Sequence, residues 1–266
     1  MNVIRPLLLL TIILTISNSM PGQTNLHFID KIQNYQQNVK LDNSSEFTLI
    51  DSTTFDTKVY LKMFDKLEIT TSLKPQVFYV ADMFGGSPYL VVVPDTFEVS
   101  RYIESELKKV KKDSFYDPDN ARGEIMSNLM QRTQKLSDNI VPTNSEEGFL
   151  QYLFFNQMAE CFALFGHSNY REKFIVSSTK KFIERMKPFR KSTSFSVDKK
   201  EYTKLKTQEM TPKISFKEDK CIIEWYEIET HNGVYKRTYE IENFAPYKIE
   251  QIENEKVLNI QPNFLY

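Results

Sequence analysis

The spacing of hydrophobic residues divides this chain into three successive regions. Between residues 47 and 93, short runs rich in β-branched and aromatic residues are separated by Asp, Thr, Lys, Gly and Pro, which is typical of strands in an antiparallel sheet. The expected strands cover residues 47–50, 58–64, 67–71, 77–81 and 89–93. We therefore expect an N-terminal antiparallel sheet.

After Pro94 the hydrophobic residues recur every three or four positions, which predicts helices. Four helices are expected, beginning near residues 95, 118, 146 and 169, and the last should end at Pro188. The third, over residues 146–165, is apolar around nearly its whole circumference, so we expect it at the centre of the core. The middle of the chain thus predicts a bundle of about four helices.

The last third of the chain returns to strand patterns, over residues 213–217, 221–230, 234–243, 247–252 and 257–260. Asn232-Gly233 between two of these runs is a strong hairpin signal. The alternation slips at Trp225 and Tyr226, which predicts a β-bulge. Residues 187–206 are polar and basic and read as a hinge. The fold class expected is α+β, with an N-terminal antiparallel sheet, a central helical bundle and a C-terminal antiparallel β-meander.

The first nineteen residues have the order of a secretory signal peptide: Arg5, an apolar run over residues 7–16, and small or polar residues up to Ser19. The apolar run would span only about 15 Å as a helix, half of a bilayer core. We expect cleavage near Ser19, export to the periplasm or the extracellular space, and no transmembrane span in the mature chain. Residues 20–266 are expected to form one domain, with a division into 47–190 and 191–266 as the alternative.

Charge is distributed unevenly although the net charge is only −1. Residues 171–217 hold 14 Lys and Arg against 5 Asp and Glu, and both flanking regions are acidic. Such a block could grip an anionic ligand or surface, or it could face the acidic remainder of the same molecule. The candidate anion-binding residues are Arg171, Lys173, Lys180, Lys181 and Arg185, and a wider basic surface would add Lys187, Arg190 and Lys191.

Only two cysteines are present, Cys161 and Cys221. In an oxidising compartment they could form a disulfide worth about 4 kcal/mol in the chain-entropy model. Both also lie in apolar patterns that suit buried thiols. The sequence leaves the two alternatives open.

Catalytic candidates are few. Glu160 follows Asn156 and Gln157 on one face of the most apolar helix, where a partly buried carboxyl could act as a general acid or could belong to a narrow polar stripe. Ser87 lies in a glycine-lined turn, but without the G-x-S-x-G pattern of a nucleophile elbow. His167 follows a predicted helix end, where turn or cap roles are equally suitable.

Several enzyme classes are excluded by missing motifs. The histidines lack the spacing of a metal-ligand pair, and no phosphate-binding loop, dinucleotide fingerprint or C-x-x-C pair occurs, so neither metal nor cofactor is expected. We therefore expect a non-catalytic envelope or extracellular protein that binds an unknown protein or ligand, and no nucleic acid. The alternatives are a hydrolase acting on an envelope polymer or peptide, and a binder of anionic surfaces through residues 171–217.

Overall fold

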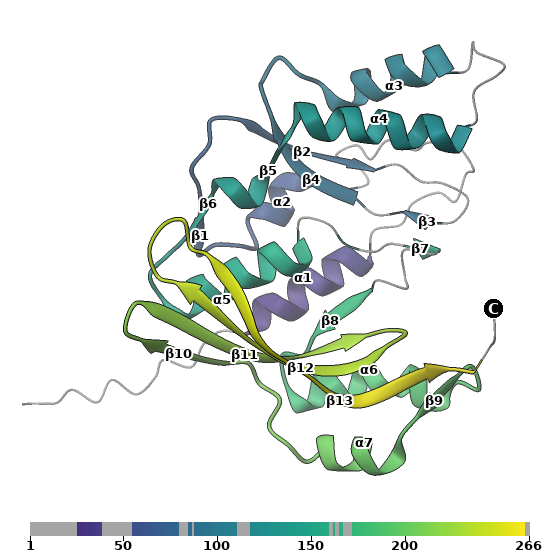
Figure 1. The fold of residues 1–266 in the computed structure, drawn as a ribbon, viewed down its shortest axis with the longest axis vertical. Helices are drawn as coiled ribbons and strands as arrows, with labels where there is room; N and C mark the ends of the chain where they lie inside the picture. Colours follow the sequence, from purple (N-terminus) through teal and green to yellow (C-terminus); the bar gives the residue numbers. More distant parts are fainter. Residues whose placement is uncertain are drawn as a thin grey trace, which may run out of the picture.

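The computed structural model describes residues 26–38, 55–79, 85–86, 88–110, 118–159, 162, 165–166 and 172–263. These residues form a mixed α/β fold in which helical layers alternate with sheets (Figure 1). The helices are α1 (His27–Gln37), α2 (Thr57–Leu61), α3 (Val99–Val110), α4 (Pro118–Arg132), α5 (Glu146–Phe154), α6 (Thr179–Lys191) and α7 (Lys199–Leu205).

The strands form several antiparallel sheets. The N-terminal strands are β1 (Leu67–Ile69), β2 (Lys74–Tyr79), β3 (Gly85–Gly86), β4 (Pro88–Val93), β5 (Gln134–Lys135), β6 (Ile140–Pro142) and β7 (Phe165–Gly166). The later strands are β8 (Lys173–Ile175), β9 (Phe195–Val197), β10 (Lys213–Lys217), β11 (Lys220–Glu229), β12 (Gly233–Glu242) and β13 (Ile249–Pro262).

The largest sheet confirms the predicted antiparallel C-terminal sheet. Its order is β10-β11-β12-β13-β9, and β8 pairs with β11 beyond the end of β10. The predicted hairpin joins β11 to β12, and Gly233 has a φ of +143° there. A Cβ at this position would lie 2.3 Å from the Leu258 carbonyl oxygen, so the close approach of β13 requires glycine. The two strands expected over residues 247–260 are one continuous strand, β13.

Both faces of this sheet are covered, by different helices. Ile223 and Trp225 of β11 pack into a core with α1 and α5, whereas Tyr226 and Ile228 pack into a second core with α6 and α7. The two pairs of helices accordingly lie on opposite sides of the sheet (Figure 1). The predicted bulge at Trp225 and Tyr226 is wrong, because β11 and β12 keep an unbroken register there. The alternation slips because side chains on both faces are buried.

A smaller sheet lies on the other side of the α1 and α5 layer. It has the order β2-β4-β5, and β1 pairs separately with β6. Leu90 and Val92 of β4 belong to the core beneath this sheet, whereas Val91 and Val93 pack with α3 and α4 above it. The expected single N-terminal sheet is not confirmed, since these strands divide between separate sheets and β5 and β6 come from later in the chain.

The strand expected over residues 58–64 is wrong, because helix α2 occupies its first half. The Asp56 carboxylate caps this helix by accepting hydrogen bonds from the backbone N–H groups of Lys58 and Val59, at 2.9 and 3.0 Å. Tyr60 then points into the core and is fully buried. A local cap therefore outweighs the β propensity of this run.

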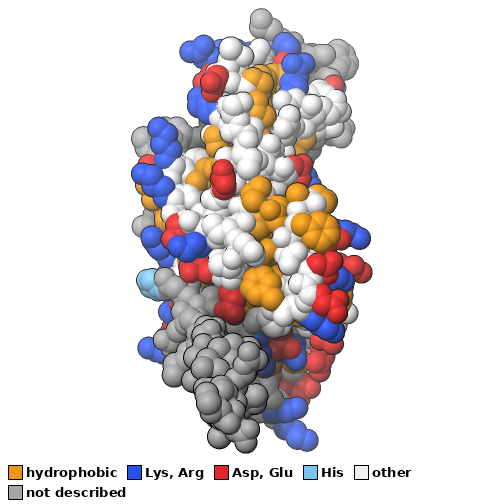
Figure 2. Space-filling model, turned by 90° about the vertical axis from the view of Figure 1, so that its left-hand side faces the viewer, with side chains coloured by type: hydrophobic (Ala, Val, Ile, Leu, Met, Phe, Trp, Pro, Cys, Tyr) orange, Lys and Arg blue, Asp and Glu red, His pale blue; other side chains and the backbone are white. Residues whose placement is uncertain are grey.

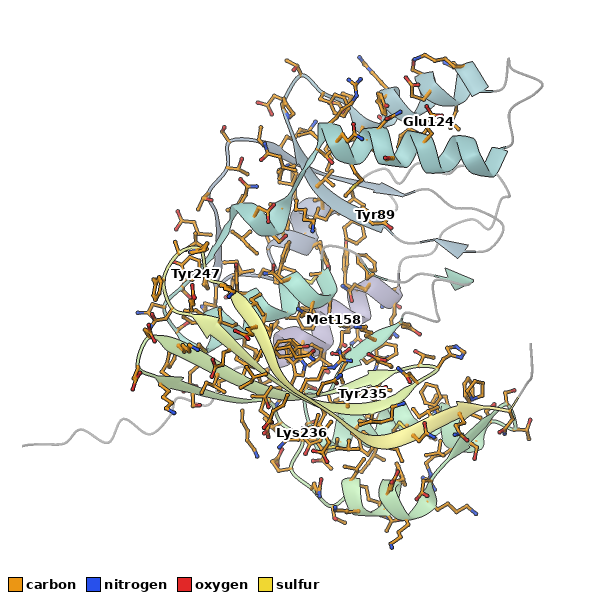
Figure 3. All side chains as sticks on the ribbon, viewed as in Figure 1. Tyr89, Glu124, Met158, Tyr235, Lys236 and Tyr247 are labelled. Atoms are coloured by element: carbon orange, nitrogen blue, oxygen red, sulfur yellow. The ribbon has the colours of Figure 1, made fainter. Side chains whose placement is uncertain are left out.

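Helix α5 lies in the core, as its apolar circumference predicts, and continues as a π-helical turn over Phe155–Ala159. The last carbonyl groups of a helical segment have no donor within it. Gln36 donates to the Met158 carbonyl oxygen at 2.9 Å, and Tyr60 donates to that of Ala159 at 3.0 Å. Figure 3 shows Met158 at the end of this segment.

The fourth predicted helix begins about ten residues later than expected. Residues 173–175 form β8, and α6 begins after Ser178, whose hydroxyl accepts from Lys181 N at 3.3 Å. Gln33 of α1 bonds both backbone groups of Ile175, at 3.1 and 2.8 Å, and so holds this segment extended. The expected four-helix bundle is not confirmed: α3 packs with α4, while α5 and α6 lie on opposite faces of the large sheet.

Large hydrophobic side chains remain exposed at several places, among them Phe216 and Phe244. Figure 2 views the side of the molecule where the β10–β11 and β12–β13 turns lie, and hydrophobic side chains gather there beside acidic ones. In the described part of the chain, no helix is both long enough and apolar enough to cross a membrane.

Candidate functional site

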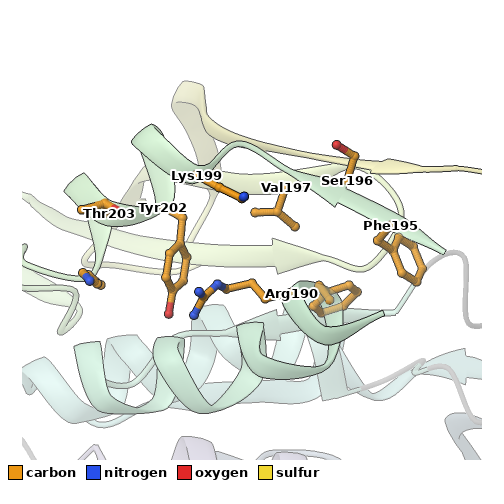
Figure 4. Close-up of a pocket in the computed structure, with 9 residues that line it drawn as sticks. Arg190, Phe195, Ser196, Val197, Lys199, Tyr202 and Thr203 are labelled. Atoms are coloured by element: carbon orange, nitrogen blue, oxygen red, sulfur yellow. The ribbon is translucent and has the colours of Figure 1, made fainter. Parts of the chain in front are cut away.

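A cavity of about 370 Å³ lies between α6, β9 and α7 (Figure 4). It falls within the segment expected to be a hinge, and that prediction is wrong, because residues 187–206 form the end of α6, strand β9 and helix α7. The lining residues are Phe189, Arg190, Phe195, Ser196, Val197, Lys199, Tyr202, Thr203 and Lys206.

Helix α7 presents one face to the cavity. Lys199, Tyr202, Thr203 and Lys206 are spaced by three and four residues, which places their side chains along the same side of a helix. The Asp198 carboxylate fixes the start of the helix by accepting from Lys200 N and Glu201 N, both at 2.8 Å.

Tyr202 joins the cavity to the second core. Its side chain is buried, and its ring lies 5.7 Å from that of Phe182. On the cavity side, the guanidinium of Arg190 lies over the Tyr202 ring at 4.2 Å from the centroid, as Figure 4 shows. A cation held in this way keeps a defined orientation while its N–H groups remain available at the edge of the plane.

The aromatic side chains at the other end of the cavity come from α6 and β9. Phe189 and Phe195 meet edge to face, with ring centroids 5.3 Å apart. Phe189 is buried by its neighbours, whereas Phe195 and Val197 are only partly buried. The cavity therefore has apolar surface as well as charge.

The charged residues in the lining of the cavity are all basic. Arg190, Lys199 and Lys206 all line it, and no lining residue is acidic. Among the described residues, none of these three side chains makes an ion pair. The three exposed cations therefore line the same cavity, and the nearest acid in the sequence, Asp198, is used to cap α7.

The cations predicted from the sequence to bind an anion have different neighbours, and two of them form ion pairs within the molecule. Lys173 lies 3.4 Å from a carboxylate oxygen of Glu227 and 3.8 Å from one of Glu229. Lys181 pairs with Glu184 at 3.0 Å and lies 4.0 Å from Asp30.

Arg185 is also engaged by neighbouring side chains of the same molecule. It donates to the Gln37 side chain at 2.6 Å and lies over the Phe174 ring at 4.4 Å. Lys180 is exposed, and Arg171 lies outside the described residues.

A second cluster of charged side chains lies on the large sheet, and its members are paired with one another. Arg237 donates to Glu227 at 2.7 Å, to Glu229 at 2.5 Å and to Asn254 at 3.1 Å. Burial raises the pKa of Glu227, although Lys173 and Arg237 oppose this. Burial alone would also raise the pKa of Glu229, but hydrogen bonds from Asn232 and Arg237 hold it below its ordinary value. This cluster is satisfied by its own members.

The three catalytic candidates, Glu160, Ser87 and His167, lie outside the described residues, so the hydrolase alternative stays a prediction. Of the polar stripe expected before Glu160, the Asn156 amide donates to the Tyr152 carbonyl oxygen at 2.9 Å and Gln157 is exposed. No group of three His, Cys, Asp or Glu side chains suited to a metal ion occurs in the described ranges.

Cys221 lies buried in the core beside α5, and burial raises the pKa of its thiol to about 12. Its predicted disulfide partner, Cys161, lies outside the described residues. The bridge therefore remains a prediction.

Sequence reasoning missed Lys199, Tyr202, Thr203 and Lys206. A signal for them existed, because Asp198 followed three residues later by Glu201 is the helix-start pattern used elsewhere in the chain. Comparison with known proteins finds no match: no family model matches this chain, and no curated protein or solved structure is significantly similar to it.

Proposed function

We propose that this protein is a non-catalytic binding protein that holds an anionic ligand in the cavity between α6, β9 and α7. The observation that carries this proposal is the presence of three cations, Arg190, Lys199 and Lys206, around one cavity that has no acidic residue in its lining. Like charges that lie close together repel one another. A bound anion offsets this repulsion, because each cation is attracted to it.

The other donors of the cavity suit the same ligand. Arg190 can bind an oxyanion with two parallel N–H groups, while the lysines act as point charges. The hydroxyl of Thr203 adds a neutral donor. Phosphate, sulfate and carboxylate groups all accept hydrogen bonds from such a set.

The proposal assigns anion binding to fewer cations than the basic surface expected from the sequence. Lys173, Lys181 and Arg185 are engaged by neighbouring side chains, so they are less suited to an external anion. We also propose that the protein is exported, on the pattern of residues 1–19, and that it meets its ligand in the envelope or outside the cell.

The test is calorimetric titration of the protein with sodium phosphate and sodium sulfate at low ionic strength. The site variant is R190Q/K199Q/K206Q. The matched control is K180Q/K187Q/K200Q, which removes three exposed lysines of α6 and α7 that do not line the cavity. Both variants change the net charge by the same amount.

We expect the wild-type protein and the control to bind, the site variant to lose binding, and the affinity to fall as salt is added. Equal losses in both variants would show that general surface charge, not the cavity, attracts the anion. Absence of binding in the wild-type protein would overturn the proposal.

A further inference from the structure

The volume and the walls of the cavity point beyond a simple inorganic anion. At about 370 Å³ the cavity is in the lower range of small-molecule sites. A water molecule takes about 30 Å³ of liquid, so this space would hold about a dozen waters. An oxyanion of five atoms fills only a small part of it, which leaves room for an organic group.

The apolar part of the lining indicates which organic group fits. Phe195 and Val197 of β9 line the cavity together with Phe189 of α6. The edge-to-face contact between Phe189 and Phe195 forms an aromatic corner, and the His231 ring already lies 5.4 Å from that of Phe195, so a ligand ring would extend an existing cluster. This apolar surface is partly exposed and lies beside a group of cations. A ligand with a flat apolar ring and a negative charge would cover the surface and also pair with the cations.

The charged part of the lining adjoins this corner. Arg190 follows Phe189 directly in α6, and its guanidinium is stacked on Tyr202. Figure 4 shows Arg190 and Tyr202 between Phe195 on one side and Thr203 on the other. An anion at Arg190 would therefore have an aromatic wall to one side and the donors of α7 to the other.

We infer that the ligand is an aromatic phosphate ester, in which a dianionic phosphate is joined to a planar ring. The phosphate binds Arg190 and the lysines of α7, and the ring packs in the corner formed by Phe189 and Phe195. Three cations suit a dianion better than a single carboxylate. This inference rests on the proposed function, since it specifies the ligand class of the same cavity.

The experiment compares four probes by calorimetric titration: phenyl phosphate, glycerol 2-phosphate, inorganic phosphate and phenol. Phenyl phosphate and glycerol 2-phosphate carry the same charged group and differ in the ring. We expect phenyl phosphate to bind at least about fivefold more tightly than glycerol 2-phosphate, as expected for one aromatic contact. Phenol alone should bind weakly.

The variant F195A removes one side of the aromatic corner, and F216A removes an exposed phenylalanine of β10 as the matched control. We expect F195A to abolish the preference for phenyl phosphate while the affinity for inorganic phosphate is unchanged, which also shows that the variant is folded. F216A should behave like the wild-type protein.

The possible results distinguish a failure of the aromatic-ligand inference from a failure of the proposed anion site. If all three phosphates bind equally and only R190Q/K199Q/K206Q abolishes binding, the anion site stands and the aromatic ligand is overturned. If no phosphate binds, both are overturned. If the preference for phenyl phosphate survives in F195A, the ring lies elsewhere and the inference fails.

Discussion

The two groups of basic side chains in the C-terminal half differ in what neutralises them. On the large sheet, Arg237 and Lys173 are paired with Glu227 and Glu229. Around the cavity, Arg190, Lys199 and Lys206 have no carboxylate among the lining residues. The first group is a structural network, whereas the second is suited to an external anion.

The difference arises from strand pairing and not from local composition. Pairing of β8 with β11 places Lys173 opposite Glu229 in register, so the basic residue meets an acid that lies far away in the sequence. Near the cavity, the local acid Asp198 is used to cap α7. A basic stretch therefore marks a binding site only where the fold keeps carboxylates away from it.

The comparison is tested most strongly by removing one arginine from each group. Arg237→Met should lower the free energy of unfolding by about 3–5 kcal/mol, because Glu227, only 1% exposed, would lose the closer of its two cationic partners. Arg190→Met should change it by about 1 kcal/mol or less, since only the stacking on Tyr202 is lost. Urea denaturation measures both, and equal effects would remove the distinction between the two groups.

The reactivity of thiols compares solvent access to the core beside α5, where Cys221 lies, with solvent access to the cavity. In a Cys161→Ser background, Cys221 should react with iodoacetamide about 1000-fold more slowly than an unfolded thiol at neutral pH, because its pKa of about 12 leaves little thiolate. A cysteine introduced by Thr203→Cys in a C161S/C221S background should react readily, because Thr203 is exposed at the edge of the cavity. Rapid labelling of native Cys221 would contradict the buried position.

The pH dependence of stability tests the carboxylates of the group on the large sheet. The folded state holds the pKa of Glu229 below its ordinary value of 4.5, so its contribution is present above that pH and is lost as the pH falls through the folded pKa. Glu229→Gln should therefore cost about 1.5–3 kcal/mol at pH 7, with a difference from the wild-type protein that shrinks below pH 4.5. Glu184→Gln, at an exposed carboxyl, is the control and should change little.

The smallest effect is expected from the cavity itself without ligand. K199Q/K206Q relieves repulsion between like charges and leaves the stacking of Arg190 on Tyr202 in place, so it should raise the free energy of unfolding by a few tenths of a kcal/mol at low ionic strength. Added salt should remove this gain by screening. A variant that is less stable than the wild-type protein would show that these side chains serve the fold.

Local patterns in the sequence predict the C-terminal strands well. Strand β10 begins and ends where expected, and the Asn-Gly signal marks the β11–β12 hairpin. The same reasoning fails at β8, because the extended backbone there depends on Gln33, which is 142 residues away. It fails at Trp225 and Tyr226 because only the assembled layers show that both faces of the sheet are buried.

The candidate site was predicted less well than the fold. The charge count of residues 171–217 drew attention to the part of the chain that lines the cavity, but it could not separate paired from unpaired cations. Helix α7 was missed because Tyr202 and Leu205 are its only buried residues, which is too few for a hydrophobic period. Capping residues are the better signal for such a short helix.

The unbroken course of β13 determines how the cavity can be lost. The strand pairs with β12 through Asn259 and then with β9 over residues 260–262, and its Leu258 and Ile260 fill the second core. Loss of the pairing over residues 260–262 would release β9 from its strand neighbour and open one wall of the cavity. A single cleavage within β13 before residue 260 could therefore disrupt the cavity while most of the large sheet stays paired.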